Sequence, residues 1–333
     1  MAWDTIYEPE HDRIVSPVSR IWNVIWGGFV LFEWDTYFAA LLAGLDHKDL
    51  AYANAIEMTR DKTEAGFVPN FSTVANIKSR DRSEPPVGSI CCLELYKRFG
   101  EEWFLEEVFD NLLEWNRWWN THRQSNGFLC WGSDPYEPIA DSNLELESGG
   151  VNTWQGAAFE SGLDNSPMFD DIPFDRQTHL MQLADVGLNG LYIADCDALA
   201  EIADVLGKTQ ITVELRQRAE TYRQLLRSLW DEPTGIFLNR RIDTGEFSYR
   251  LSPTNFYALL GRAADQEQAE RMIAEHFYNP EEFWGKWILP TTARNDPAYH
   301  DQTYWRGRIW GPTNFLVYLG LKNYKLPQAV KDL

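Results

Sequence analysis

The sequence predicts an all-α fold, a toroid of helical hairpins with small β-hairpin or loop insertions. Helical periodicity recurs in pairs of segments joined by short links, and long loops rich in polar and aromatic residues separate the pairs. The sequence does not show the alternation of strands and helices that is typical of a parallel sheet. Because loops at one end of paired helices lie together, we expect them to build one funnel-shaped face. We interpret residues 1–333 as a single domain.

The helices are predicted from apolar residues that recur three and four positions apart. The first follows the aromatic run Phe32–Phe38 and ends near Leu45, and Pro85-Pro86 marks the start of the third, because a first helical turn tolerates proline. Gly235-Ile236-Phe237 and Gly245-Glu246-Phe247 are typical of a β-hairpin or paired turns. Three tryptophans form one stripe on the fourth helix, which we interpret as core: Trp115, Trp118 and Trp119. Helices after the first are predicted over about 47–62, 87–99, 102–123, 186–206, 210–230, 254–261, 266–277 and 312–322.

The stretch from Gly127 to Gln182 is a long excursion rich in Gly, Asn, Asp and Pro, and so long a loop in a compact domain is usually functional. Within it, Gly162 allows a tight turn, and Asn165-Ser166-Pro167 stops any helix. Asp164 is thereby predicted to lie at the apex of a constrained loop with apolar neighbours. A carboxyl group in such surroundings has a raised pKa and can act as a general acid. An ordinary turn aspartate is the alternative interpretation.

Composition and charge exclude several classes of partner. The net charge of −20 argues against binding to nucleic acid or to anionic membranes. No apolar run reaches the roughly 18 residues that a membrane span needs, and the N-terminus does not resemble a signal peptide. The four cysteines show neither metal-ligand spacing nor a disulfide framework, so we expect a cytoplasmic protein. The 15 tryptophans predict either a large helical core or stacking platforms for sugar rings in a concave site.

Five segments place Asp, Glu, Asn or Arg near an aromatic residue or a proline, and we expect all five to lie on loops. Carboxylates and amides suit paired sugar hydroxyls, while Arg and Trp orient and stack the ring. Ordinary interpretations exist as well: Asp35 as a helix N-cap, Arg82 with Glu84 as a surface ion pair, and Trp310 as core. The segments are Glu33-Trp34-Asp35, Pro69-Asn70-Phe71, Arg82-Ser83-Glu84, Ser161–Asn165 and Tyr304–Trp310.

In their order along the chain, these segments resemble glycoside hydrolase family 63 and, more distantly, the family 37 trehalases. The resemblance implies an (α/α)6 barrel and inverting hydrolysis of an α-glycosidic bond. Within the family, the likeness is closest to compact bacterial members that act on mannosylglycerate or glucosylglycerate. It is carried by Trp34–Phe38, Gly66–Asn70, Arg82–Pro86, Glu160–Pro167, Leu289–Thr292, Tyr304–Gly307 and Trp310–Pro312.

The resemblance also implies roles for individual residues. The family's general acid maps onto Asp164, and its sugar-binding positions map onto Trp34, Asp35, Asn70, Arg82 and Trp310. We extend the predicted substrate site to neighbours of these residues, namely Tyr37, Glu84, Asn165, Tyr304 and Trp305. We expect a small carbohydrate substrate, no cofactor and no metal. A divalent ion at Asp170-Asp171 is the less favoured alternative to a solvated loop, and the oligomeric state is left open.

The chain departs from the family at its catalytic base. That base is a Glu in the final hairpin, whereas the last Glu of this chain is Glu282. About nine helices are predicted, and a closed ring of six hairpins needs twelve. We therefore expect the domain to lack part of its first hairpin and most of its last, and to bind substrate better than it turns it over. The alternatives are a catalytically silent sugar-binding protein on the same fold, an α-glucosidase for oligosaccharides and, less favoured, a lyase or epimerase that uses His300.

Overall fold

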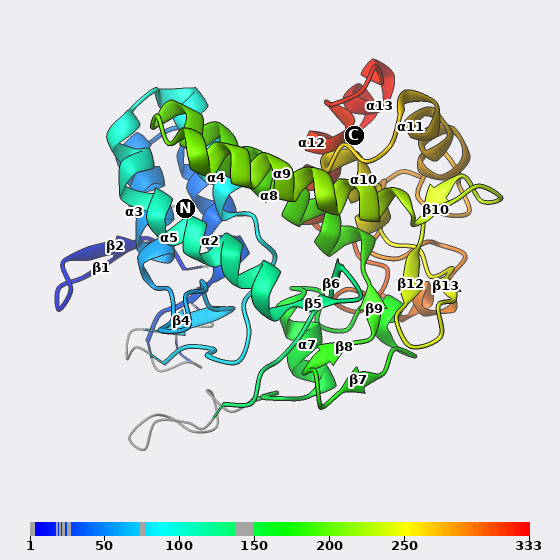
Figure 1. Cartoon of the computed structure of the whole chain (residues 1–333), viewed down its shortest axis with the longest axis horizontal. Helices are drawn as coiled ribbons and strands as arrows, with labels where there is room; N and C mark the ends of the chain where they lie inside the picture. Colours follow the sequence, from blue (N-terminus) through cyan, green and yellow to red (C-terminus); the bar gives the residue numbers. More distant parts are fainter. Residues whose placement is uncertain are drawn as a thin grey trace. The chain divides into compact units, whose positions relative to one another are not determined.

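The computed structural model describes residues 4–17, 19, 21, 24, 28–73, 77–136 and 149–333. These residues form many helices, with short antiparallel strand pairs between them (Figure 1). The chain divides into two compact units. Unit 1 comprises Met1–Arg123, Gly132–Gly162 and Asp195–Gln217, and unit 2 comprises Gln124–Trp131, Leu163–Ala194 and Arg218–Leu333. The predicted acid loop therefore passes from unit 1 to unit 2, and the single-domain interpretation stays a prediction.

Unit 1 contains helices drawn mainly in blue and cyan in Figure 1. Its strands are β1 (Ile6–Glu8), β2 (Arg13–Val15), β3 (Val30–Phe32) and β4 (Phe71–Thr73), which pair as antiparallel β1–β2 and β3–β4. Its helices are α2 (Glu33–Ala43), α3 (Lys48–Arg60), α4 (Gly88–Phe99), α5 (Glu102–His122) and α7 (Trp154–Glu160). Helix α2 packs against α3 and α4, and α5 packs against the same two helices.

Large aromatic side chains fill the interior of unit 1. Trp115, Trp118 and Trp119 are all buried, which confirms the core interpretation of that stripe. Gly88, at the start of α4, allows α4 to approach α5 and α2 closely. A Cβ atom at this glycine would lie 2.8 Å from the Trp115 ring and 2.9 Å from the Tyr37 ring, so no larger residue fits without displacing an aromatic side chain.

Unit 2 holds shorter elements joined by hairpins. Its strands are β5 (Gln124–Ser125), β6 (Phe128–Leu129), β7 (Phe174–Asp175), β8 (Leu180–Met181), β9 (Leu183–Ala184), β10 (Trp230–Asp231), β11 (Ile236–Phe237), β12 (Asn239–Arg241) and β13 (Phe247–Ser248). Its helical elements are η2 (Pro167–Phe169), η3 (Pro253–Phe256), α10 (Tyr257–Leu260), α11 (Gln266–Met272), the π-helical turn η4 (Ile273–Phe277), η5 (Pro297–Asp301), α12 (Gly311–Leu321) and α13 (Pro327–Asp332). Helices α8 (Val186–Val205) and α9 (Thr209–Arg227) each contribute residues to both units.

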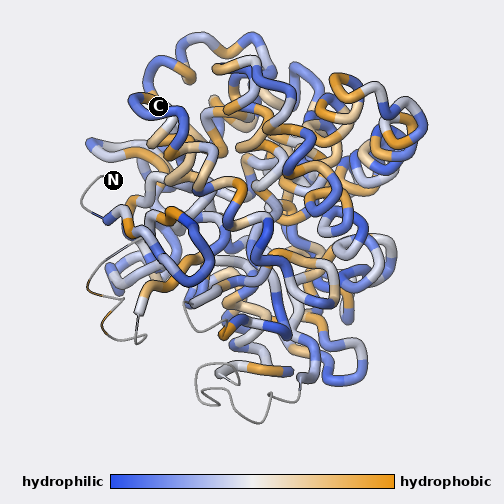
Figure 2. Tube along the Cα trace, turned by 90° about the vertical axis from the view of Figure 1, so that its left-hand side faces the viewer, coloured by the Kyte–Doolittle hydropathy of each residue, from blue (hydrophilic) through white to orange (hydrophobic). Residues whose placement is uncertain are grey.

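Within unit 2, the order β13-β12-β9 makes a three-stranded antiparallel sheet, while the other strands pair in twos. Helix α10 packs against α12, and Gly320 permits this contact because a Cβ atom there would lie 2.9 Å from the backbone nitrogen of Leu260. Apolar and polar residues alternate along the helices of the trace (Figure 2), as expected for helices with one face in a core. None of the helices in the described part of the chain has the length and apolar character of a membrane span.

Most predicted helices are confirmed to within a few residues, and so are the hairpins around Ile236 and Phe247. The excursion from Gly127 to Gln182 is less irregular than predicted, because it contains α7 and several short strands; its residues 137–148 lie outside the described ones. Helix α13 was not predicted. Helix α7 escapes prediction because it is short and has Gly156 at its third position, where a Cβ atom would collide with the Gly150 carbonyl oxygen.

Candidate functional site

The segment Glu33-Trp34-Asp35 forms the first turn of α2 and not a loop. Phe32 is the N-cap of this helix, so the N-cap interpretation of Asp35 is wrong. The β3–β4 pair brings the segment next to Pro69-Asn70-Phe71, because Phe32 lies opposite Phe71 in the antiparallel register. The backbone N–H of Glu33 also donates to the Asn70 carbonyl oxygen at 3.1 Å. Two of the five predicted segments therefore lie side by side in unit 1.

The side chain of Asn70 connects these two segments to a third. Its amide nitrogen donates to Oε1 of Glu84 at 2.6 Å, and its amide oxygen accepts from Nε of Arg82 at 3.3 Å. The other oxygen of Glu84 accepts from the backbone N–H of Trp34 at 3.2 Å. Asn70, Arg82 and Glu84 are all buried, so the surface ion-pair interpretation of Arg82 and Glu84 is wrong.

Arg82 pairs instead with its neighbour Asp81. Its Nη1 donates to the two carboxylate oxygens of Asp81 at 2.9 and 3.0 Å, and to the carbonyl oxygen of Gly149 at 3.1 Å. The guanidinium group lies over the Phe159 ring, with its carbon 5.0 Å from the ring centroid. These contacts fix the orientation of the Arg82 charge within unit 1.

Glu33 has a fully buried carboxyl group without a hydrogen-bond partner among the described residues. Burial raises the pKa of this carboxyl well above its ordinary value, and the nearby carboxylates of Glu84, Asp35 and Asp195 raise it further. Both effects favour the neutral form of Glu33 over the ionised form. Closed off from solvent, this carboxyl group does not offer its oxygens to a sugar.

Tyr37 is a core residue in this structure. It is fully buried, its hydroxyl group is 2.7 Å from the hydroxyl of Thr59, and its ring stacks on Trp115 with centroids 6.3 Å apart. Burial raises the pKa of its phenol well above the ordinary value. Core packing therefore accounts for a tyrosine at this position, and we leave Tyr37 out of the proposed substrate site.

The loop that carries Asp164 folds as the sequence predicts. Gly162 has a positive φ of 66°, and a Cβ atom there would lie 2.8 Å from the Trp34 ring, so glycine is required for both conformation and space. The N–H of Ser166 closes the turn by donating to the Leu163 carbonyl oxygen at 2.8 Å. Pro167 then begins η2. Asp164 itself is half-buried, and its neighbours Leu163, Met168 and Phe169 are buried.

The residue after Asp164 is held by the Tyr304–Trp310 segment, which also belongs to unit 2. The side-chain oxygen of Asn165 accepts from the backbone N–H of Trp305 at 3.0 Å, and its carbonyl oxygen accepts from Nη1 of Arg306 at 3.2 Å. Trp305 is buried and stacks on Trp310 with ring centroids 4.6 Å apart. Trp310 is half-buried and donates from its indole to the Tyr304 carbonyl oxygen at 2.9 Å, which makes it more than a core residue.

Asp170 is already surrounded by positive charge. It accepts from Arg306 at 2.9 Å and from Arg250 at 2.9 Å, and these guanidinium groups also bind Asp301 and Asp296. A divalent ion at Asp170 would have to displace two guanidinium groups. Asp170 is therefore ion-paired, which is neither the solvated loop nor the metal site considered from the sequence.

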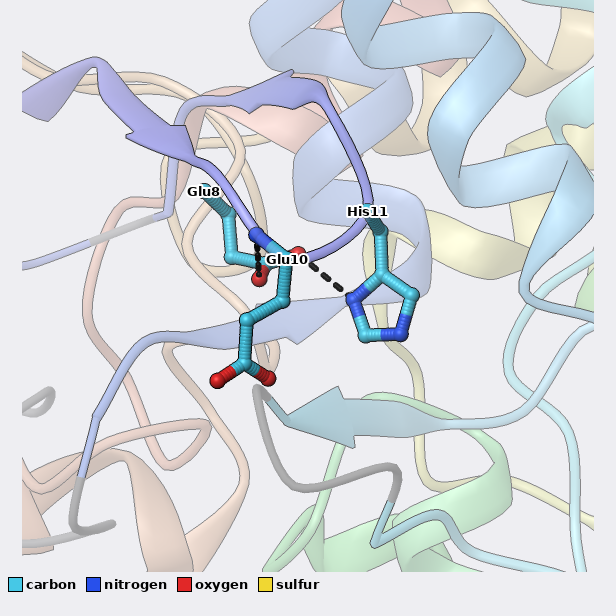
Figure 3. A group of neighbouring side chains, drawn as sticks. All are labelled: Glu8, Glu10 and His11. Atoms are coloured by element: carbon cyan, nitrogen blue, oxygen red, sulfur yellow. Dashed lines mark hydrogen bonds and ion pairs between the residues drawn. The ribbon is translucent and has the colours of Figure 1, made fainter.

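Another group of carboxylate and imidazole side chains lies on the β1–β2 hairpin of unit 1 (Figure 3). Glu8, Glu10 and His11 could each present one ligand atom within 4.8 Å of the others. However, Glu8 already accepts from His11 Nδ1 at 2.8 Å and from Arg13 Nε at 3.2 Å. A metal ion bound here would therefore have to replace these contacts of Glu8, and exposed carboxylates such as that of Glu10 are common without an ion.

Sequence reasoning missed a buried ion pair in unit 1, formed by Arg123 at the end of α5 and Glu160 at the end of α7. Their shortest contact, from Nε to Oε2, is 2.8 Å, and both side chains are fully buried. Glu160 was noted only as the first residue of a family-like run. A charged residue at a helix end normally predicts a surface position, so no sequence signal identified this pair.

A family model described as the mannosylglycerate hydrolase MGH1-like glycoside hydrolase domain matches residues 29–333. The chain belongs to this glycoside hydrolase family. Among curated relatives of the domain, the mannosylglycerate hydrolase of Rubrobacter radiotolerans is 25% identical over 72% of this chain and 62% of the relative. The probable trehalase of Eremothecium gossypii is 22% identical over 91% of this chain and 47% of the relative. The chain thus spans less than two thirds of the length of either relative.

A solved structure shares the fold of this glycoside hydrolase domain. The GH63 mannosylglycerate hydrolase of Thermus thermophilus, in complex with glucose, superimposes with a TM-score of 0.70 over 91% of this chain and 83% of that one, at 17% identity. The resemblance to family 63 and the (α/α)6 barrel class predicted from the sequence are thereby confirmed.

Proposed function

We propose that the chain hydrolyses the α-glycosidic bond of a small substrate, such as α-mannosylglycerate or α-glucosylglycerate, with inversion at the anomeric carbon. The observation that carries the proposal is the folding of Glu160–Pro167 into the constrained turn expected of the family's acid-bearing segment. Relatives named as a mannosylglycerate hydrolase and a trehalase support a small α-glycoside as substrate. The buried free thiols of all four cysteines support a cytoplasmic location.

Asp164 is the general acid in this proposal. As the bond from the anomeric carbon to the leaving oxygen breaks, that oxygen takes the Asp164 proton. A water oxygen bonds to the anomeric carbon from the opposite face and gives its proton to a second carboxylate, a role that is not assigned to any residue named above. The products are the free sugar and the alcohol. A half-buried carboxyl on a turn that is hydrogen-bonded at Gly162 and Asn165 has the fixed position that such a transfer requires.

Two groups of residues are proposed to bind the substrate. In unit 1 these are Trp34, Asp35, Asn70, Arg82 and Glu84, and in unit 2 they are Asn165, Tyr304, Trp305 and Trp310. The hydrogen bonds that join Asn70 to Arg82 and Glu84 support a preorganised polar group in the first set. In the second set, Tyr304 is exposed and Trp310 is half-buried, so both residues are partly accessible, as a residue that stacks on a sugar must be.

The test compares Asp164→Asn with the matched control Asp171→Asn, an exposed aspartate on the same loop. On α-mannosylglycerate and α-glucosylglycerate we expect Asp164→Asn to lose about 10²- to 10⁴-fold in kcat, because the amide cannot donate an acidic proton. The control should keep its rate, and NMR of the first-formed anomer reports inversion. A wild-type rate in Asp164→Asn would contradict the proposal. Tight calorimetric binding by the wild-type chain without product would favour the silent sugar-binding protein instead.

An α-glucosyl disaccharide or oligosaccharide is the second substrate class. The match to a probable trehalase over 91% of this chain favours it. Trehalose and short α-glucosides should therefore be assayed beside the two glycerates, and a higher kcat/KM on them would move the substrate assignment to that class.

A further inference from the structure

The carboxyl group of Glu160 accepts hydrogen bonds from three donors, all within unit 1. Nε of Arg123 lies 2.8 Å from Oε2 and 3.0 Å from Oε1. The backbone N–H of Ser83 donates to Oε1 at 3.0 Å, and that of Gly132 donates to Oε2 at 2.6 Å. Because the side chain is fully buried, solvent does not replace any of these contacts.

The guanidinium group of Arg123 also has hydrogen-bond acceptors besides Glu160. Its Nη1 donates to Asp134 at 3.0 Å and its Nη2 to the Asp81 carbonyl oxygen at 3.1 Å, while its guanidinium carbon lies 4.5 Å from the Trp118 ring centroid. Burial opposes the charge, but the carboxylates of Glu160 and Asp134 raise the pKa of Arg123 above its ordinary value. The pair is therefore an ionic contact with compensated charge.

This ion pair joins the end of α7 to the segment that carries Arg82 and Glu84. Ser83, between them, is held at two points: its N–H donates to Glu160, and its hydroxyl donates to the Val68 carbonyl oxygen at 2.6 Å. The indole of Trp115 donates to the same hydroxyl at 2.9 Å. The carboxylate of Glu160 thus holds the end of α7 at a fixed distance from Arg82 and Glu84, the proposed sugar-binding residues of this segment.

Only three residues separate Glu160 from Asp164. The N–H of Ser161 donates to the Ala158 carbonyl oxygen at 3.2 Å, and that of Gly162 donates to the Phe159 carbonyl oxygen at 3.0 Å. Hydrogen bonds therefore hold the first two residues of the turn to the last residues of α7. Gly162 lies close to the Trp34 ring, because a Cβ atom added there would be 2.8 Å from it. A displacement at the end of α7 would therefore shift the start of the turn, Ser161 and Gly162, which leads to Asp164.

We propose that Glu160 is a positioning residue for the general acid, and that it fixes the start of the Asp164 turn against the Arg82-Ser83-Glu84 segment. This inference rests on the proposed function. A buried ion pair often contributes little net stability over an apolar pair of the same shape, and in some proteins it enforces one geometry, which is the role inferred for Glu160. A misplacement of about 1 Å at a reacting group can cost about 10²-fold in rate.

The experiment measures how Glu160→Gln depends on the leaving group. A glycerate leaving group needs the acid's proton, whereas 2,4-dinitrophenolate leaves without one. With the α-glycosyl glycerate that the wild-type chain hydrolyses faster, we expect kcat to fall about 10²-fold with little change in KM. With the matching 2,4-dinitrophenyl α-glycoside, we expect the variant to stay within about threefold of wild type.

Glu8→Gln is the matched control, because Glu8 is also a buried carboxylate of unit 1 paired with an arginine, and it lies outside the family match. It should leave both rates near wild type. An equal fall of Glu160→Gln on both substrates, or rates as in the control, would overturn the positioning role. Absence of wild-type turnover on every glycoside would instead overturn the proposed function.

Amide hydrogen exchange decides the positioning role independently of activity. In Glu160→Gln we expect amides of residues 161–166 to exchange about tenfold faster or more, since the turn loses its anchor. Glu8→Gln should leave that segment unchanged. Exchange of residues 161–166 at the wild-type rate in a folded Glu160→Gln chain would overturn the inference.

Discussion

Two glutamates of unit 1 are fully buried, Glu33 at the start of α2 and Glu160 at the end of α7, and their surroundings are opposite. Burial raises the pKa of Glu160, but a guanidinium and two backbone N–H groups oppose that rise. The carboxyl group of Glu33 has no hydrogen-bond partner among the described residues, and the carboxylates near it raise its pKa further. The comparison shows that burial alone does not decide what a carboxyl group does. Its partners decide whether the rise in pKa that burial causes is opposed, as at Glu160, or increased, as at Glu33.

Removing the partner of Glu160 should have the largest effect, because it turns the paired carboxyl group into one like Glu33. We expect Arg123→Met to lower the free energy of unfolding by about 3–5 kcal/mol, as is typical when a buried charge loses its counter-ion. Urea denaturation measures the loss. Arg13→Met, which removes a partly exposed guanidinium from the β1–β2 hairpin, should cost less. A loss under about 1 kcal/mol in Arg123→Met would mean that the two carboxyl groups do not differ in the way described.

The pH dependence of stability tests the neutral state of Glu33. Its folded-state pKa lies above the unfolded value of 4.5, so its contribution is fully present below pH 4.5 and is lost as pH rises toward the folded pKa. The loss amounts to about 1.4 kcal/mol per pH unit in that window. Glu33→Gln cannot ionise, so its free energy of unfolding should rise relative to wild type as the pH rises above 4.5 toward the folded pKa of Glu33. Parallel pH profiles for the two chains would show that Glu33 is ionised in the fold.

The turn after Glu160 can be probed through its glycine. We expect Gly162→Ala to cost about 1–3 kcal/mol, because alanine disfavours the positive φ and its Cβ would meet the Trp34 ring. Gly207→Ala is the matched control, with a φ of 68° and no atom within 4 Å of the added Cβ. The difference between the two variants in thermal unfolding isolates the contact with Trp34. Equal losses would show that this contact does not restrain the turn.

The smallest effect is expected at the other end of α7. Thr153 caps this helix by accepting from the Gly156 N–H at 3.1 Å, so Thr153→Ala should cost about 1 kcal/mol. Thr121→Ala, which removes an exposed hydroxyl from α5, should change stability by less than about 0.5 kcal/mol. Urea midpoints compare the two variants. An unchanged midpoint in Thr153→Ala would mean that α7 is held by Glu160 alone.

The sequence predicted the long helices well because their signal is local. The tryptophan stripe of α5 and the Pro85-Pro86 start of α4 need no knowledge of the rest of the chain. Helix α7 was missed because Gly156 is a poor helix former whose place is explained only by the Gly150 carbonyl beside it. Local periodicity carries no information about such a distant contact.

The candidate site also has some features with a local sequence signal and others that depend on distant contacts. Its segments were found because sugar-binding residue types recur beside aromatic ones, and the turn at Gly162 follows from backbone chemistry. The ion pair between Arg123 and Glu160 joins residues 37 positions apart, and each alone looks like a surface charge. The burial of Glu33 likewise depends on the tertiary fold, and the sequence around Glu33 does not predict it.

The identity of the proton donor is tested most directly by the leaving-group dependence of Asp164→Asn. The account predicts that this variant loses at least about 10²-fold in kcat on an α-glycosyl glycerate and hydrolyses the matching dinitrophenyl glycoside at close to the wild-type rate. A variant that cleaves the glycerate as fast as wild type, or that loses both activities to the same extent, would contradict the assignment of Asp164.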